Sequence, residues 1–98
     1  MRIIAKKTLV LYAMKHPQAY CCLEDWYEKV REAAWNNLSD IRRTFNSVDY
    51  VGNQRYVFNI GGNNYRLVVL IIMTAKCVYI RFVGTHSQYN KIKEIKNI

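Results

Sequence analysis

The chain has 98 residues, 51% of them hydrophobic, and a formal net charge of +8. This length suits one domain around a single modest hydrophobic core, so we expect residues 1–98 to form one domain. The longest uninterrupted apolar run, Leu67–Met73, has seven residues and is far too short to span a membrane. No signal peptide is recognisable, so we expect a cytoplasmic protein without a membrane partner.

The basic charge is concentrated in the second half of the chain. Four of the seven acidic residues lie between Glu24 and Glu32, whereas residues 41–98 carry nine basic and two acidic residues, a net charge of +7. A surface with this bias attracts polyanions through phosphate contacts and counterion release. A basic face that is merely solvated explains the charge equally well. Charge alone therefore leaves nucleic-acid binding as one of two interpretations.

The cysteines and histidines indicate neither a disulfide framework nor a metal site. Cys21, Cys22 and Cys77 are odd in number and include an adjacent pair, and no C-x-x-C spacing suggests zinc. The only histidines, His16 and His86, have no partner at a ligand spacing. We therefore expect no metal and no cofactor, and three cysteines that act as small apolar residues in a reducing compartment.

A short strand and a helical hairpin are predicted for the first part of the chain. Arg2–Ala5 is a β-type segment, and helical spacing follows it. The first helix should end at His16-Pro17, because a residue before proline avoids the helical region. A second helix is expected from about Gln18 to Asn36. Its apolar face comprises Leu23, Trp26, Tyr27, Val30 and Ala34. Ser39-Asp40 then has the composition of a cap for a short helix with Ile41 and Phe45.

The second half is predicted to form a sheet. Three segments rich in Val, Ile, Tyr and Phe read as strands: Arg55–Ile60, Tyr65–Thr74 and Lys76–Val83. Gly61-Gly62-Asn63-Asn64 is a strong turn, so the first two strands form a hairpin, and the third follows after a very short connection. The central strand is apolar on both faces, which predicts that both are covered, with helices on one of them.

The chain should end in a short helix and a mobile tail. Thr85 or Ser87 could cap a helix containing Tyr89 and Ile92, and we expect Lys93–Ile98 to fray. The predicted fold class is therefore α+β. An N-terminal short strand, added at a sheet edge, and a helical hairpin pack on a small, mainly antiparallel sheet that is followed by the C-terminal helix.

Two arginines stand out within the predicted strands. Arg66 and Arg81 each place a charge inside an otherwise apolar strand, where burial without a partner is costly. Either side chain could be exposed at an edge or paired with a carboxylate. The functional alternative is phosphate recognition, because a fixed guanidinium holds phosphate oxygens and offsets the charge that gathers on them.

Metal-free RNA cleavage is a reaction that these residue types fit. The 2′-hydroxyl attacks the neighbouring phosphate and the 5′-oxygen leaves, so charge must be stabilised and protons must be moved. Arg66 and Arg81 suit the first task, whereas His86 and Tyr89 suit the second, since imidazoles and phenols transfer protons. A lone histidine is more often structural than catalytic, so the identity of the proton carrier stays open.

Three segments in this order resemble the HigB family of toxins. They are RYVFNIGGNNYRL at 55–67, YIRFV at 79–83 and THSQYNK at 85–91. Arg2-Ile3-Ile4 and Phe45 followed by Asp49-Tyr50 are similar too. The resemblance extends over essentially the whole chain, and the ordered combination is more specific than any single motif.

The resemblance implies a RelE-like fold and an mRNA interferase, an endoribonuclease that cuts messages in the A site of translating ribosomes. The implied partner is a HigA-type antitoxin with a helix-turn-helix domain, and operator DNA would be bound only through the complex. Carried over by position, the catalytic candidates are Arg66, Arg81, His86 and Tyr89. The candidates for RNA binding are Arg55, Tyr56, Lys91 and Lys93.

Two positions depart from the family pattern. Relatives often carry an acidic residue where this chain has Gln88, and another where it has Asn90. A local carboxylate that would orient His86 is therefore missing, so charge stabilisation and substrate positioning are the firmer expectation. Two further interpretations stay open: a noncatalytic RNA- or ribosome-binding module that uses the same basic face, and a co-repressor of an antitoxin.

Overall fold

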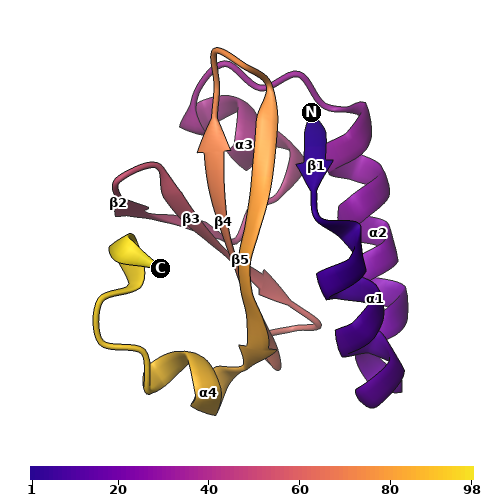
Figure 1. Cartoon of the computed structure of the whole chain (residues 1–98). Helices are drawn as coiled ribbons and strands as arrows, with labels where there is room; N and C mark the ends of the chain where they lie inside the picture. The colour runs from indigo at the N-terminus through magenta and orange to yellow at the C-terminus, as the bar shows by residue number, and fades with distance from the viewer.

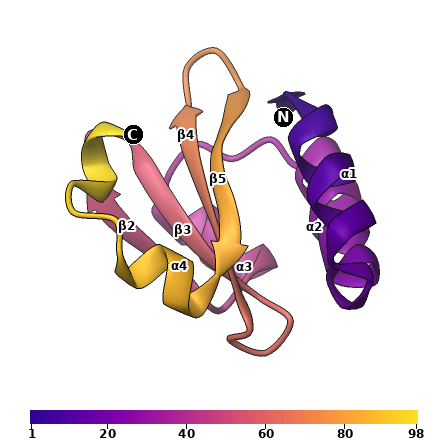
Figure 2. The same cartoon turned by 60° about the horizontal axis from the view of Figure 1, so that its bottom comes forward.

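The computed structural model describes all of residues 1–98, and a single sheet separates two unequal layers (Figures 1 and 2). Three helices cover one face, and the C-terminal segment crosses the other. Along the chain the elements are β1 (Arg2–Ile4), α1 (Lys6–Lys15), η1 (Pro17–Ala19), α2 (Tyr20–Glu32), α3 (Leu38–Thr44), β2 (Val48–Gly52), β3 (Arg55–Ile60), β4 (Tyr65–Ile72), β5 (Cys77–Thr85), α4 (His86–Asn90) and η2 (Ile95–Asn97), where η marks a 3-10 turn.

The five strands lie in the order β1-β5-β4-β3-β2. The strand β1 runs parallel to β5, and every other neighbouring pair is antiparallel. The predicted α+β class, the meander β3-β4-β5 and the edge position of the first strand are therefore confirmed. None of the helices is long and apolar enough to cross a membrane.

The strand β2 was not foreseen from the sequence. It pairs with β3 at the other edge of the sheet, with Val48 opposite Phe58. Only Val48 of this strand is buried, while Asp49 and Tyr50 are exposed. An edge strand that faces solvent along most of its length lacks the alternating apolar pattern that identifies a half-buried strand.

The helical hairpin forms as predicted, but its second helix is shorter. The helix α2 ends at Glu32 because Ala33 adopts an extended backbone with ψ of 159°. Leu23, Trp26 and Val30 are buried against the sheet as expected. Ala34 was wrongly placed on the same apolar face, since it lies beyond the helix and is exposed.

The short helix α3 also begins earlier than the predicted cap. Asn37, not Ser39-Asp40, is its N-cap: the Asn37 side chain accepts a hydrogen bond from the backbone N–H of Asp40 at 2.9 Å. An asparagine at this position satisfies an N–H that the first turn leaves without a helical partner. Ile41 is fully buried, whereas Phe45 follows the helix as its extended C-cap.

The C-terminal segment Lys93–Ile98, which was predicted to fray, contains the 3-10 turn η2 and makes hydrogen bonds to the rest of the chain. The guanidinium of Arg55 donates hydrogen bonds to the carbonyl of Ile98 at 2.8 and 3.2 Å. The Asn53 side chain donates to that of Asn97 at 3.2 Å. These bonds hold η2 against the loop between β2 and β3, on the side of the sheet away from the long helices (Figure 2).

Candidate functional site

The sheet face opposite the helices carries Arg66. Along β4, Leu67 and Val69 belong to the core beneath the helices, so the alternation of a strand sends Arg66 to the other face. Arg66 is 9% exposed, and its Nη1 donates to the carbonyls of Asn63 at 3.0 Å and Tyr65 at 3.3 Å. The chain's four ion pairs all lie elsewhere. A carboxylate-paired Arg66 is therefore ruled out.

Arg81 lies at a bulge in β5. Val68 is paired with Phe82 and Val69 with Ile80, so Arg81 is the extra residue on its strand. A bulge disrupts the ladder locally and can redirect a side chain. Arg81 is exposed and has neither an ion pair nor a side-chain hydrogen bond. Its guanidinium is consequently free to meet a ligand, although exposure alone is also what a solvated arginine shows.

The helix α4 begins directly after β5 and packs beside β4 and β5. Thr85, one of the two predicted caps, is the N-cap: its hydroxyl accepts from the N–H of Gln88 at 3.2 Å, and the Gln88 side chain accepts from the N–H of Thr85 at 2.9 Å. This reciprocal pair is a capping box. Gln88, at a position where an acid was expected, thus fixes the start of the helix. His86 is its first residue and Tyr89 lies within it. Ile92 was wrongly placed in this helix, which ends at Asn90.

The strand register places this helix next to Arg66. Arg66 is paired with Gly84, two residues before His86, and the N–H of His86 donates to the carbonyl of Asn64 at 3.2 Å. Two carbonyls of the β3–β4 turn therefore accept hydrogen bonds from the site: that of Asn63 from Arg66, and that of Asn64 from the start of α4. Sequence reasoning had assigned this turn no role in the site. His86 is exposed, and no carboxylate lies within ion-pairing distance of it.

Gly84 is a site residue that sequence reasoning missed. A Cβ built on it would lie 2.5 Å from Cζ of Phe82 and 2.7 Å from Oε1 of Gln88. The missing side chain lets the Phe82 ring and the capping glutamine close over the strand end. The signal in the sequence was a glycine directly before the Thr85 cap.

The four candidates for RNA binding are placed differently from one another. Lys91 and Lys93 are exposed, just after α4. Arg55 is half-buried, and its guanidinium is already bonded to the carbonyls of Asn53 and Ile98. Tyr56 is separated from the others, because it belongs to the core on the helical face and packs on Tyr50 with ring centroids 5.0 Å apart. Burial and the neighbouring Tyr50 raise the pKa of the Tyr56 phenol.

The candidate face is an open surface. Arg66, Arg81, His86 and Tyr89 line none of the cavities of the molecule. A guanidinium held by two backbone carbonyls, that of Arg66, can bind an anion by charge-assisted hydrogen bonds, and the exposed Arg81 of the neighbouring strand supplies a second guanidinium. An imidazole and a phenol at the end of the same face provide groups able to exchange protons.

Comparison with known proteins identifies the family. A family model described as HigB_toxin, the RelE-like toxic component of a toxin–antitoxin system, matches residues 20–92. The chain belongs to the HigB toxin family. The mRNA interferase toxin HigB of Escherichia coli K12 is 31% identical over 93 residues, covering 92% of this chain and 88% of that protein. The mRNA interferase HigB of Escherichia coli O6:H1 is 28% identical over 94 residues, covering 94% and 91%.

The match to the HigB family extends over the candidate site. Its range runs from α2 to Ile92, so it includes Arg66, Arg81 and the whole of α4. Of the candidate residues, only Lys93 lies outside it. The resemblance seen in the sequence is therefore confirmed at the level of the family, and the RelE-like fold agrees with the five-stranded sheet and its helices.

Proposed function

We propose that this HigB-family chain is an mRNA interferase, a metal-independent endoribonuclease that cleaves messages in the A site of translating ribosomes. The observation that carries the proposal is Arg66, a nearly buried guanidinium without a carboxylate partner, beside the start of α4. Within the chain only Nη1 of Arg66 is hydrogen-bonded, so the N–H groups of Nε and Nη2 have no protein partner.

The cleavage step balances without a metal. The 2′-oxygen of one nucleotide bonds to the adjacent phosphorus while the bond from phosphorus to the 5′-oxygen breaks. The 2′-hydroxyl loses a proton and the leaving 5′-oxygen gains one, which leaves a 2′,3′-cyclic phosphate and a 5′-hydroxyl. Negative charge gathers on the phosphate oxygens in between, and removing one preorganised donor from such a site costs about 10²–10³-fold in rate.

Arg66 and Arg81 take the electrostatic role in this scheme. Arg66 has a fixed direction because two carbonyls hold it, so it needs little rearrangement when the phosphate charge develops. Arg81 is exposed and supplies a second guanidinium that can follow the RNA strand. His86 and Tyr89 are the candidates for moving the two protons. Neither has a carboxylate that would orient it, so we assign the larger share of catalysis to charge stabilisation and to positioning of the message by the ribosome.

A HigA-type antitoxin with a helix-turn-helix domain completes the proposed system. Family membership supports an antitoxin partner, because the family is described as one component of a toxin–antitoxin system. The toxin itself would reach operator DNA only through that complex.

The test is to induce the wild-type chain, Arg66→Ala and Arg42→Ala separately in a bacterial host. Arg42 is an exposed arginine on α3 and controls for the loss of one positive charge. We expect growth arrest and new message 5′ ends for wild type and Arg42→Ala, and neither for Arg66→Ala. Folded Arg66→Ala that still arrests growth and cleaves messages would refute the role of Arg66. Binding to RNA without new ends in any variant would favour a noncatalytic module.

A further inference from the structure

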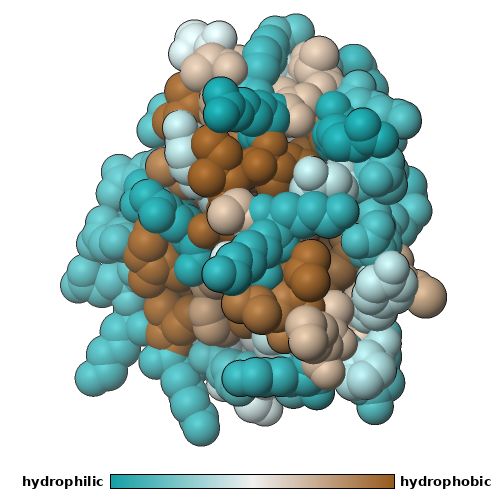
Figure 3. Space-filling model, turned by 45° about the vertical axis from the view of Figure 1, so that its right-hand side comes forward, coloured by the Kyte–Doolittle hydropathy of each residue, from teal (hydrophilic) through white to brown (hydrophobic).

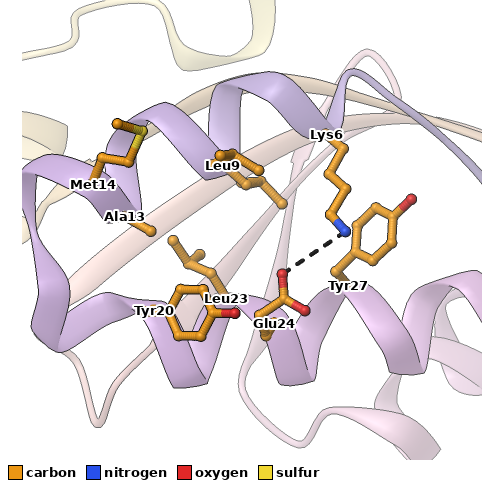
Figure 4. A pocket seen from close by; sticks show the side chains of 9 residues that line it. Lys6, Leu9, Ala13, Met14, Tyr20, Leu23, Glu24 and Tyr27 are labelled. Atoms are coloured by element: carbon orange, nitrogen blue, oxygen red, sulfur yellow. Dashed lines mark ion pairs between the residues drawn. The ribbon is translucent and has the colours of Figure 1, made fainter.

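The outer surface of the helical layer contains an apolar groove between α1 and α2. Its volume is about 140 Å³. Figure 4 shows the side chains that line it. Leu9, Ala13 and Leu23 form its buried floor, and Val10, Met14 and Tyr20 stand at its sides. This groove lies on the helical side of the sheet, whereas Arg66 lies on the opposite face.

Several large apolar side chains at this groove are exposed to solvent. Val10 is 44%, Tyr20 55% and Met14 73% exposed, and these are three of the five large hydrophobic residues that the chain exposes. In Figure 3, which brings the side with α1 and α2 forward, hydrophobic residues gather near the centre of the view, with hydrophilic side chains around them and across them. Scattered apolar residues are normal on a surface, but a contiguous patch with a polar border indicates an interaction site.

The charge around the groove selects the kind of partner. The helix α1 has three lysines and no acidic residue. Lys6 pairs with Glu24 at 3.9 Å and lies 4.4 Å from the ring centroid of Tyr27, which closes one end of the groove. Lys7 has no ion pair and shares the face of α1 that carries Val10 and Met14, at i, i+3 and i+7. The helix α2 carries four acidic residues, three of which are already in ion pairs within the chain. The groove is thus apolar, and the free charge beside it on the α1 side is positive.

A second copy of the chain is a poor occupant. Each copy carries a net charge of +8, so two copies repel each other as a whole. Like charges brought together at an interface oppose association. A segment with apolar side chains and negative charge meets both requirements.

We propose that the groove between α1 and α2 binds an acidic amphipathic helix of the antitoxin. Apolar side chains spaced i, i+3 or i+4, and i+7 would enter the groove between Val10, Met14 and Tyr20, and carboxylates beside them would meet Lys7. This proposal rests on the antitoxin partner of the proposed function but does not depend on RNA cleavage. It leaves Arg66 and α4 uncovered by this contact, so the groove anchors the partner away from the candidate active face.

The experiment measures binding of the purified, full-length chain to the HigA-type antitoxin encoded beside it, by titration calorimetry. The groove variant is Val10→Ser with Met14→Ser. The matched control is Leu11→Ser, because Leu11 is the next residue on the same helix, is 49% exposed and does not line the groove. These exposed positions contribute little to folding, which thermal unfolding of each variant verifies.

We expect the double variant to weaken binding at least about tenfold and Leu11→Ser to leave it within about twofold, since apolar anchors at the centre of an interface dominate affinity. Lys7→Glu should also weaken binding and reduce its dependence on salt. RNA cleavage by all three variants should equal that of wild type. Wild-type affinity in the double variant, an equal loss in Leu11→Ser, or no binding by the wild-type chain would each overturn the proposal without touching the nuclease claim. Self-association that the double variant abolishes would also overturn it, in favour of a second copy.

Discussion

Gly84 joins the sheet to the C-terminal helix, and its hydrogen side chain is what lets Phe82 and Gln88 pack there. Gly84→Ala would place a methyl group 2.5 Å from the Phe82 ring and 2.7 Å from the capping oxygen of Gln88. Overpacking of this kind costs about 1–3 kcal/mol of unfolding free energy. We therefore expect Gly84→Ala to lower the urea-unfolding midpoint and to reduce RNA cleavage, because α4 carries His86. A variant as stable and as active as wild type would contradict this packing.

Tyr56 makes stability depend on alkaline pH. Burial and the adjacent Tyr50 raise the pKa of the folded-state phenol above its ordinary value of 10.0. Above pH ~10 the unfolded chain releases this proton more readily than the folded chain, so the free energy of unfolding falls as pH rises. Tyr56→Phe should flatten that fall. Urea unfolding of both proteins between about pH 9 and 11 measures it, and parallel curves would show that Tyr56 does not contribute.

Among the elements, the C-terminal segment is held in place mainly by hydrogen bonds from Arg55. The Arg55 guanidinium is bonded to the carbonyls of Ile98 and Asn53, which holds η2 against the sheet edge. Arg55→Ala should free this segment, and hydrogen exchange at residues 93–98 should accelerate at least about tenfold. The matched change Arg81→Ala removes an arginine without such bonds. Equal protection in wild type and Arg55→Ala would mean that other contacts hold the segment.

The sequence predicted a helix or a strand correctly wherever its apolar residues recur with a clear helical spacing or form a run rich in β-branched residues. The helical spacing of α2 and the Val- and Ile-rich strands β3, β4 and β5 made those elements predictable. The edge strand β2 was not predicted, because most of its residues are exposed. The position of the C-terminal segment was not predicted either, because it depends on hydrogen bonds from Arg55, which is distant in the sequence. Both are nonlocal effects.

The candidate site was predictable in part for the same reason. A charge within an apolar strand marked Arg66 and Arg81 as unusual, and the structure places them in β4 and β5 as expected. Strand register decided the rest. It sends Tyr56 to the core, puts Arg81 at a bulge and sets Gly84 beside Arg66. None of these positions can be obtained from spacing, because a shift of one residue in register reverses every side chain.

We assign a function to two faces of the molecule. One is the sheet face that carries Arg66, and the other carries the apolar groove between α1 and α2. With a net charge of +8, RNA binding at the first face should weaken steeply as salt increases. Each phosphate contact to a single strand contributes about −0.7 to the slope of log K against log salt.

Arg81→Ala should therefore reduce the size of that slope by about 0.7, whereas Arg42→Ala should leave it unchanged. Fluorescence anisotropy with a 2′-O-methyl RNA oligonucleotide measures binding without cleavage, since the attacking hydroxyl is blocked. An unchanged slope in Arg81→Ala would mean that this arginine does not contact phosphate.

The role of Arg66 in catalysis is tested by cleavage of a defined message in a purified translation reaction, with wild-type, Arg66→Ala and Arg42→Ala proteins. The lengths and chemical ends of the fragments are determined together with the cleavage rate. We predict 5′-hydroxyl and 2′,3′-cyclic phosphate ends at wild-type rate for Arg42→Ala, and a rate at least about 10²-fold lower for Arg66→Ala. Cleavage at the wild-type rate by a folded Arg66→Ala protein would show that Arg66 does not stabilise the transition state.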